Sequence, residues 1–111
     1  MLVKPAKELK FIEQDIEDNF LSLPNNSLIK KGIQRAITKL KENVFAGENI
    51  RKERIPKEYI QKYLIDNLWW YPLPDAWRLV YSIATSKSEV LVTIIEYFDH
   101  KNYAKRFGYK S

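Results

Sequence analysis

Three strand-like runs near the end of the chain, joined by very short links, constrain the fold more than any other feature. The runs cover residues 67–73, 76–84 and 89–98 and are rich in Trp, Tyr, Val and Ile, which favour strands. Pro74-Asp75 and Ser86-Lys87-Ser88 supply turn residues between them. Links of this length join antiparallel neighbours, because a parallel connection needs a crossover of a dozen or more residues. The sequence therefore predicts a small antiparallel sheet.

The first half of the chain has the period of amphipathic helices instead. Residues 6–22 and 28–44 repeat apolar residues at spacings of three and four, with charged residues on the remaining faces. Asn26 or Ser27 can cap the second helix, and Gly47 can terminate it. Two such helices joined by a short polar link predict an antiparallel hairpin.

Shorter segments complete the predicted order of elements. Residues 48–55 fit either a short edge strand or a basic loop, and both interpretations stay open. Residues 56–63 predict a short helix, because their leading proline suits a first helical position. Asp99 can cap a final helix over 100–107, which Gly108 would end.

Helices followed by strands indicate an α+β fold in a single domain over residues 1–111. The predicted architecture is an N-terminal antiparallel helical hairpin packed on a small antiparallel β-sheet, with a short C-terminal helix. Side chains alternate along 76–84 between an apolar set and a set with one charge: Trp77, Leu79, Tyr81 and Ile83 against Arg78, Val80, Ser82 and Ala84. We expect the apolar set to face the helices and Arg78 to lie on the open face.

Composition excludes several classes of protein. The chain has no cysteine, which rules out disulfides and thiolate metal sites, and its single histidine leaves a zinc site short of ligands. No apolar run approaches the roughly 18 residues of a membrane span. The N-terminus lacks the apolar core of a signal peptide. We therefore expect a cytoplasmic protein with no metal, no cofactor and no membrane contact.

The positive charge is concentrated in the middle of the chain. The formal net charge is +5, and residues 27–62 carry ten Lys and Arg against four Asp and Glu. Residues 1–26, in contrast, carry three against five. A basic block in a small domain is typical of a protein that binds a polyanion. A solvated, lysine-rich helix face has the same composition, so both interpretations stand.

The side chains best suited to catalysis lie in the last third. Arg78 sits inside an apolar run, and the only histidine, His100, is one helical turn from Tyr103. Arginine can neutralise a phosphoryl group, while tyrosine and a histidine of ordinary pKa near about 6.5 can move protons. The set suits phosphodiester cleavage. Structural interpretations compete: Arg78 could pair with Glu96 across the sheet. His100 could satisfy backbone groups at the helix start, and Tyr103 could be a packing residue.

The order of these segments resembles the RelE/ParE toxin superfamily, over roughly residues 1–109. The matching pieces are Leu23-Pro24, the basic helix, Gly47, Asn67-Leu68-Trp69, Trp77-Arg78-Leu79-Val80-Tyr81 and His100-x-x-Tyr103. The resemblance implies a compact α+β fold whose open sheet face holds the active groove. RelE-like members cut messenger RNA in the ribosomal A site, whereas ParE-like members poison DNA gyrase. Both are typically silenced by an antitoxin encoded alongside, so the implied partners are a cognate antitoxin, mRNA and the ribosome.

The resemblance also implies roles for individual residues. Arg78 matches the strand arginine that contacts the reacting phosphate, and His100 and Tyr103 are similar to the C-terminal residues used for proton transfer. The residues expected to contact RNA phosphates are Arg51, Lys52, Arg54, Lys101, Lys105 and Arg106. A proline-led insert over 56–63 departs from the family pattern.

The implied function is a metal-independent endoribonuclease (an mRNA interferase) that cleaves ribosome-bound mRNA by attack of the ribose 2′-hydroxyl. The alternatives are a ParE-like gyrase inhibitor and a non-toxic member that binds nucleic acid or a partner protein. An aromatic cluster could serve as stacking platforms for exposed bases, or as core or partner interface: Trp69, Trp70, Tyr71 and Trp77.

Overall fold

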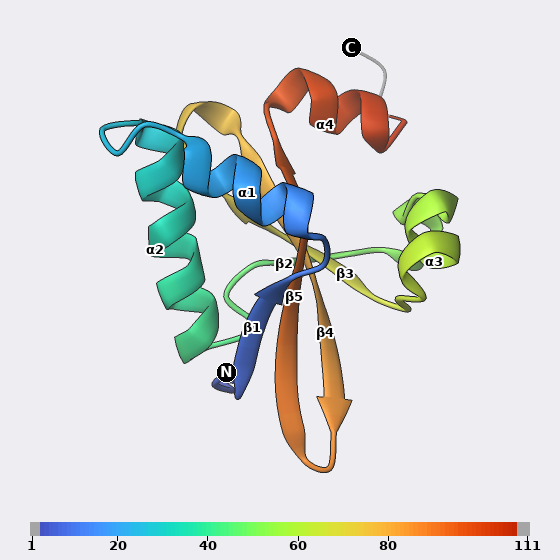
Figure 1. The fold of residues 1–111 in the computed structure, drawn as a ribbon. Helices are drawn as coiled ribbons and strands as arrows, with labels where there is room; N and C mark the ends of the chain where they lie inside the picture. Colours follow the sequence, from blue (N-terminus) through green and yellow to red (C-terminus); the bar gives the residue numbers. More distant parts are fainter. Residues whose placement is uncertain (1–2, 109–111) are drawn as a thin grey trace.

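The computed structural model describes residues 3–108 and has an α+β fold built on one five-stranded mixed sheet (Figure 1). The strands are β1 (Glu8–Phe11), β2 (Glu48–Ile50), β3 (Leu68–Pro72), β4 (Arg78–Ser86) and β5 (Glu89–Phe98), in the spatial order β1-β5-β4-β3-β2. The helices are α1 (Gln14–Ser22), α2 (Leu28–Glu42), α3 (Lys57–Tyr63) and α4 (His100–Arg106), with 3-10 turns η1 (Lys52–Arg54) and η2 (Pro74–Ala76). No helix of the described residues is long and apolar enough to cross a membrane. Residues 1–2 and 109–111 of the predicted domain, and the end of the resembling segment, lie outside the described residues.

The sheet departs from the prediction at its first strand. Four strands pair antiparallel, but β1 lies parallel to β5, with Leu9 opposite Val92. The predicted helix over 6–22 is therefore wrong in its first part, since the helix begins only at Gln14. Leu9 and Phe11 are spaced two apart, so both face the core from a strand. The chain thus opens on a strand rather than on a helical hairpin, and α1 diverges from α2 beyond the turn that joins them (Figure 1).

The second helix begins as predicted and ends earlier. The hydroxyl of Ser27 accepts a hydrogen bond from the Lys30 backbone N–H at 3.2 Å, which caps α2. Asn43 is the C-cap of α2, so Gly47 does not terminate this helix. A Cβ atom on Gly47 would lie 2.4 Å from the Trp70 carbonyl oxygen. Glycine is required there because β2 begins in close contact with the backbone of β3.

One lysine of the basic block serves the fold rather than the surface. Lys30 is buried, and its ammonium donates to the carbonyl oxygens of Leu21 and Leu23 and to Asn25 Oδ1, each at 3.0 Å. These carbonyls belong to the end of α1, where the helix dipole favours a cation. The other basic residues of α2 are exposed: Lys31, Arg35, Lys39 and Lys41.

Both faces of the sheet are covered, so the face that was predicted to be open is partly closed by α3 and α4. The core beneath α1 and α2 is mainly aliphatic and includes Ile33, Ala36, Leu40, Val44, Leu79, Tyr81, Val92 and Ile94. The core beneath α3 and α4 is richer in aromatic residues and includes Ile50, Tyr59, Leu68, Val80, Ile95, Phe98, Tyr103 and Phe107. The predicted apolar set of β4 faces α1 and α2, which confirms the assignment of that strand's faces.

The strand β5 contains a β-bulge, which changes which of its side chains share a face. Between Val80 and Tyr81 the pairing with β5 shifts by one, so that Ile95 has no opposite residue. The extra residue changes the parity of the strand. Thr93 and Glu96, which simple alternation places on opposite faces, therefore both lie on the face of α3 and α4.

The far end of β4 extends beyond its neighbour β3, whose pairing stops at Tyr81. There the side-chain amide of Asn67 makes the two backbone hydrogen bonds that a neighbouring strand would make. Its Nδ2 donates to the Ile83 carbonyl oxygen at 2.7 Å, and its Oδ1 accepts from the Ile83 N–H at 2.9 Å. Lys87 and Ser88 then turn the chain with positive φ at both residues, as the type I′ turn of a two-residue hairpin requires.

Candidate functional site

A pocket rich in arginine lies on the face of α3 and α4, where the segment after β2 meets β3, β4 and α4. The described residues that line this arginine pocket are Asn49, Ile50, Arg51, Arg54, Trp70, Arg78 and Tyr103. They include three arginines and no carboxylate. Guanidinium groups gathered in one pocket favour an anion, because each can bind it through charge-assisted hydrogen bonds.

Arg78 lies between two aromatic rings. Its guanidinium carbon is 3.8 Å from the centroid of the Trp70 ring and 4.4 Å from that of Tyr103. Trp70 is opposite Val80 and Pro72 is opposite Arg78, so Trp70 and Arg78 are diagonal neighbours on one face of the sheet. The ion pairs among residues 3–108 do not include Arg78. Aromatic rings at these distances hold the guanidinium by cation–π contact, and its N–H groups are the donors that an anion would use.

Tyr103 is held in place by the local structure of α4. Asp99 caps the helix as predicted, with its Oδ1 accepting from the Asn102 backbone N–H at 2.8 Å. The Tyr103 ring stacks on Phe107 with centroids 4.4 Å apart and meets Phe98 edge-on. Only 2% of Tyr103 is exposed, so its ring is a fixed wall of the pocket. The alternative interpretation of Tyr103 as a packing residue therefore holds alongside its position at the pocket.

The segment after β2 brings two of the predicted basic residues to the pocket. The structure contains both a short strand, β2, and an irregular turn, η1, where the sequence left strand and loop open. Ile50 and Ile55 bury their side chains at either end of this turn. Arg51 and Arg54 line the pocket, whereas Lys52 is exposed and does not belong to the lining.

The structure does not bring His100 to the pocket. His100 is the first residue of α4, is exposed, and is absent from the described lining. Lys101 is exposed beside it and is also absent from the lining. Of the three residues predicted to be catalytic, Arg78 and Tyr103 share a site.

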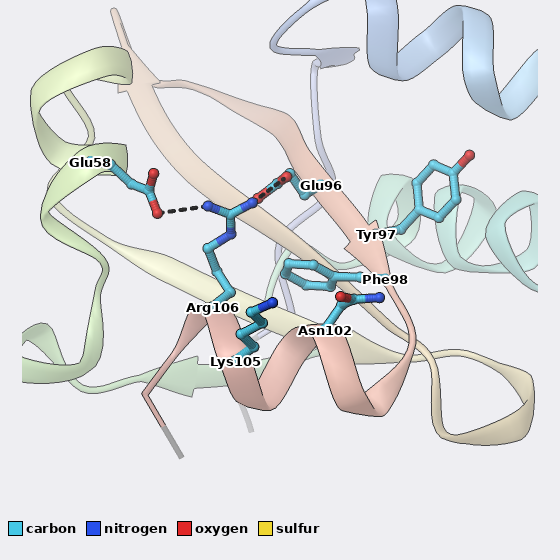
Figure 2. Close-up of a pocket in the computed structure, with 7 residues that line it drawn as sticks. All are labelled: Glu58, Glu96, Tyr97, Phe98, Asn102, Lys105 and Arg106. Carbon is cyan, nitrogen blue, oxygen red and sulfur yellow. Dashed lines mark hydrogen bonds and ion pairs between the residues drawn. The ribbon is translucent and has the colours of Figure 1, made fainter. Parts of the chain in front are cut away.

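Lys105 and Arg106 line a neighbouring pocket instead, together with Glu58 and Glu96 (Figure 2). The Arg106 guanidinium donates to Glu58 at 2.7 Å and forms an ion pair with Glu96 at 3.6 Å. The hydrogen bond with Glu58 is the main cause that raises the pKa of Arg106. Arg106 is thus engaged by two carboxylates, and Glu96 pairs with it rather than with Arg78.

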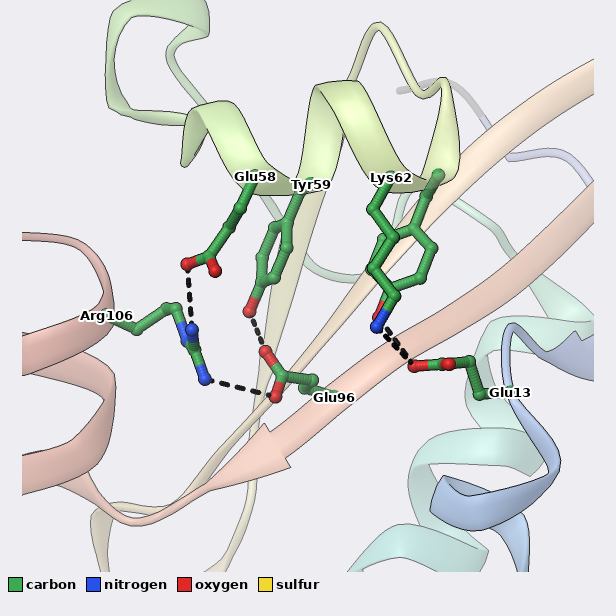
Figure 3. Close-up of polar contacts among 7 residues, drawn as sticks. Glu13, Glu58, Tyr59, Lys62, Glu96 and Arg106 are labelled. Carbon is green, nitrogen blue, oxygen red and sulfur yellow. Dashed lines mark hydrogen bonds and ion pairs between the residues drawn. The ribbon is translucent and has the colours of Figure 1, made fainter.

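Polar contacts tie α3 to its surroundings at both ends (Figure 3). Near its start, the buried Tyr59 hydroxyl donates to the Glu96 carboxylate, and desolvation followed by this bond raises the pKa of Tyr59. At its end, the Tyr63 hydroxyl donates to Glu13 at 2.7 Å and Lys62 contacts the same carboxylate at 3.4 Å. The bond from Tyr63 is the main cause that lowers the pKa of Glu13.

Trp70 lines the arginine pocket but was not predicted from the sequence to be a residue of the site beside Arg78. It appeared only as one member of an aromatic cluster, and Asn49 and Ile50 were not assigned to any site. Its position beside Arg78 depends on the register between β3 and β4. A turn centred on Asp75, with residue numbers pairing symmetrically about it, is the signal that places Trp70 diagonally from Arg78.

No protein-family model matches the chain, and neither a curated protein nor a solved structure matches it. The fold and the site define a small α+β protein with an arginine-lined pocket on one face of its sheet. Within residues 3–108, His, Cys, Asp and Glu side chains form no group of three that could hold a metal ion. The absence of a metal and of a cofactor from the reaction stays a prediction.

Proposed function

We propose that this protein is a RelE-like endoribonuclease that cleaves ribosome-bound mRNA without a metal ion. The observation that carries the proposal is that Arg51, Arg54 and Arg78 line one pocket together with Tyr103. A phosphodiester fits such a pocket because guanidinium groups bind phosphate oxygens in a bidentate manner. The resemblance to the RelE/ParE superfamily implies a strand arginine at the reacting phosphate, and Arg78 is that residue in this chain.

The proposed reaction is an internal transesterification. A base removes the proton of the ribose 2′-hydroxyl, and its oxygen attacks the adjacent 3′ phosphorus. The bond from phosphorus to the 5′ oxygen breaks as an acid protonates that oxygen, which leaves a 2′,3′-cyclic phosphate. The phosphorane carries additional negative charge, which the edge of the Arg78 guanidinium stabilises. We assign proton transfer to Tyr103 rather than His100, because Tyr103 lines the pocket and His100 does not.

The remaining elements of the proposal follow from the family resemblance. The two N-terminal helices form a layer on one side of the sheet, and the active groove lies on the other side, where Arg78 is found. The proposed partners are a cognate antitoxin, mRNA and the ribosome, and the proposed compartment is the cytoplasm.

The test is controlled expression in cells, followed by mapping of transcript ends. The wild-type protein should cut within translated frames, and Arg78→Ala should cut about 10²–10³-fold less, as loss of a transition-state donor predicts. The matched control is Arg35→Ala, which removes an exposed arginine of α2 on the opposite side of the sheet and should cut like the wild type. Folding of each variant is checked by circular dichroism.

Two outcomes would contradict the nuclease proposal. Equal cleavage by Arg78→Ala and the wild type would remove Arg78 from the site. Growth arrest with DNA damage and intact transcripts, unaffected by Arg78→Ala, would favour the gyrase inhibitor instead.

A further inference from the structure

The arginine pocket poses an electrostatic problem for Arg78. Arg51 and Arg54 line the same pocket, and like charges at short range repel one another. No ion pair among residues 3–108 fixes the Arg78 guanidinium. A long side chain in this situation would spread over several rotamers, so another interaction must select one of them.

The two aromatic rings supply that interaction from different elements. Trp70 comes from β3 and Tyr103 from α4, and the Arg78 guanidinium lies within 4.4 Å of both ring centroids. We call this pair of rings the aromatic slot. A guanidinium is planar and stacks on aromatic faces, so a slot with two walls fixes its plane as well as its position.

Arg106 provides a comparison, because carboxylates rather than aromatic rings hold its guanidinium. Arg106 is also fixed, but by the carboxylates of Glu58 and Glu96, which neutralise its charge (Figure 3). Arg78 is fixed by neutral rings, which leave its full positive charge and its edge donors for an incoming anion. The same residue type is therefore held in two ways within one face of the sheet, one way for structure and the other for binding.

We propose that Trp70 is a positioning residue of the site, which acts through Arg78 and does not touch the reacting atoms. With Tyr103 it forms the slot that turns the guanidinium edge toward the scissile phosphate. This inference rests on the proposed nuclease function for its kinetic consequence, whereas the slot itself is testable without any activity.

The kinetic test compares two substitutions of Trp70. Trp70→Leu removes the aromatic wall and should lower kcat by about 3- to 30-fold, the range that cation–π stabilisation supports. KM should change less, because Arg51 and Arg54 still bind the substrate phosphate. Trp70→Phe keeps an aromatic face and should recover most of the loss. A loss shared equally by Leu and Phe, or no loss with Leu, would overturn the positioning role.

Chemical rescue provides a readout that a purely structural tryptophan would not affect. In Arg78→Ala the slot is vacated, and free guanidinium at millimolar, non-denaturing concentration should restore part of the cleavage. Adding Trp70→Leu to Arg78→Ala should abolish this rescue, whereas adding Trp70→Phe should keep it. Rescue of all three proteins to the same extent would show that the slot does not bind the ion.

A binding measurement separates failure of this inference from failure of the proposed function. Guanidinium is titrated into Arg78→Ala while the Trp70 indole N–H is followed by NMR, assigned by comparison with the double variant Arg78→Ala/Trp70→Phe. A saturable shift of the Trp70 signal supports the slot even in a protein that cuts no RNA. A signal that does not move overturns the slot, whether or not the wild type is a nuclease.

Discussion

The cores on the two faces of the sheet differ in the kinds of side chain that they contain. Beneath α1 and α2 the core is mainly aliphatic, with Ile33, Leu40 and Val92 fully buried, and α2 is a helix of 15 residues. Beneath α3 and α4 the core is more aromatic, and the two helices have 7 residues each. Helices this short do not form alone, so they depend on packing and on polar contacts such as that of Tyr59 with Glu96.

This difference separates stability from binding. A face filled with aliphatic side chains gains free energy from burial, and its one buried charge, Lys30, is bound by carbonyl oxygens at the end of α1. The other face, which α3 and α4 cover, has room between its elements for the arginine pocket and for the pocket lined by Glu58, Glu96 and Arg106. We therefore expect substitutions on the first face to change folding, and substitutions on the second to change binding with less effect on folding.

The largest effect is expected from Leu40→Ala on the face of α1 and α2. Leu40 is fully buried, so its removal should lower the free energy of unfolding by about 2–5 kcal/mol through lost burial and a residual cavity. Urea unfolding followed by circular dichroism measures this loss. Cleavage per folded molecule should stay at the wild-type level, and a selective loss of cleavage would break the separation between the faces.

Salt tests the other face. If three arginines of the pocket contact phosphates of single-stranded RNA, log affinity should fall against log salt with a slope of about −2, since each contact contributes about −0.7. Fluorescence anisotropy with a labelled oligonucleotide measures the slope. Arg51→Ala should make it shallower by about 0.7, and Arg35→Ala, on α2, should leave it unchanged. An affinity that does not respond to salt would contradict the anion pocket.

A smaller effect is expected from Tyr59→Phe. The variant keeps the ring and loses the hydrogen bond to Glu96, which should lower stability by about 1 kcal/mol. Hydrogen exchange should show faster exchange in α3 and α4, with α2 protected as before. Tyr63→Phe is the matched control at the other end of α3, where the bond goes to Glu13. Equal acceleration in α2 would mean that the two faces unfold as one unit.

The last prediction concerns the stability of the fold at alkaline pH. Burial raises the pKa of Tyr81 to about 12, and its hydroxyl donates to the Val44 carbonyl oxygen at 2.8 Å. An unfolded tyrosine ionises at about pH 10. Between this pH and the pKa of Tyr81, the unfolded state therefore binds fewer protons than the folded state. Stability should therefore fall as pH rises from about 10 toward 12.

Tyr81→Phe should make this decline shallower. The decline is measured from urea unfolding midpoints at about pH 9, 10 and 11, which bracket the ionisation of an unfolded tyrosine. Wild type and variant are compared at each pH. Parallel declines in both proteins would assign the effect to other groups, such as Tyr59, whose pKa is also raised.

Local patterns predicted much of the fold because the relevant interactions are close in sequence. The strand runs correspond to β3, β4 and β5, and Asp99 caps α4 as expected. β1 was missed because it is stabilised by β5, whose paired residue Val92 lies far along the chain from Leu9. The residues of a four-residue strand also fit a helical spacing when that partner is unknown.

The candidate site was predicted in part for the same reason. The side of the sheet that carries Arg78 follows from alternation within one strand, and this prediction is confirmed. The slot requires the register of β3 against β4 and the packing of α4, neither of which is local. The bulge at Ile95 was also not predicted, because no residue type around it indicates where the strand holds one residue more than its partner.

The bond between Asn67 and Ile83 has a consequence for how molecules of this protein meet one another. Where β3 ends, β4 continues as one arm of a hairpin that projects from the body of the molecule (Figure 1). Bare strand borders invite other chains to join them and assemble into fibres. The Asn67 amide occupies both backbone groups of Ile83, so a second polypeptide must first displace it. A single side chain thus occupies the backbone groups through which another strand would pair at Ile83.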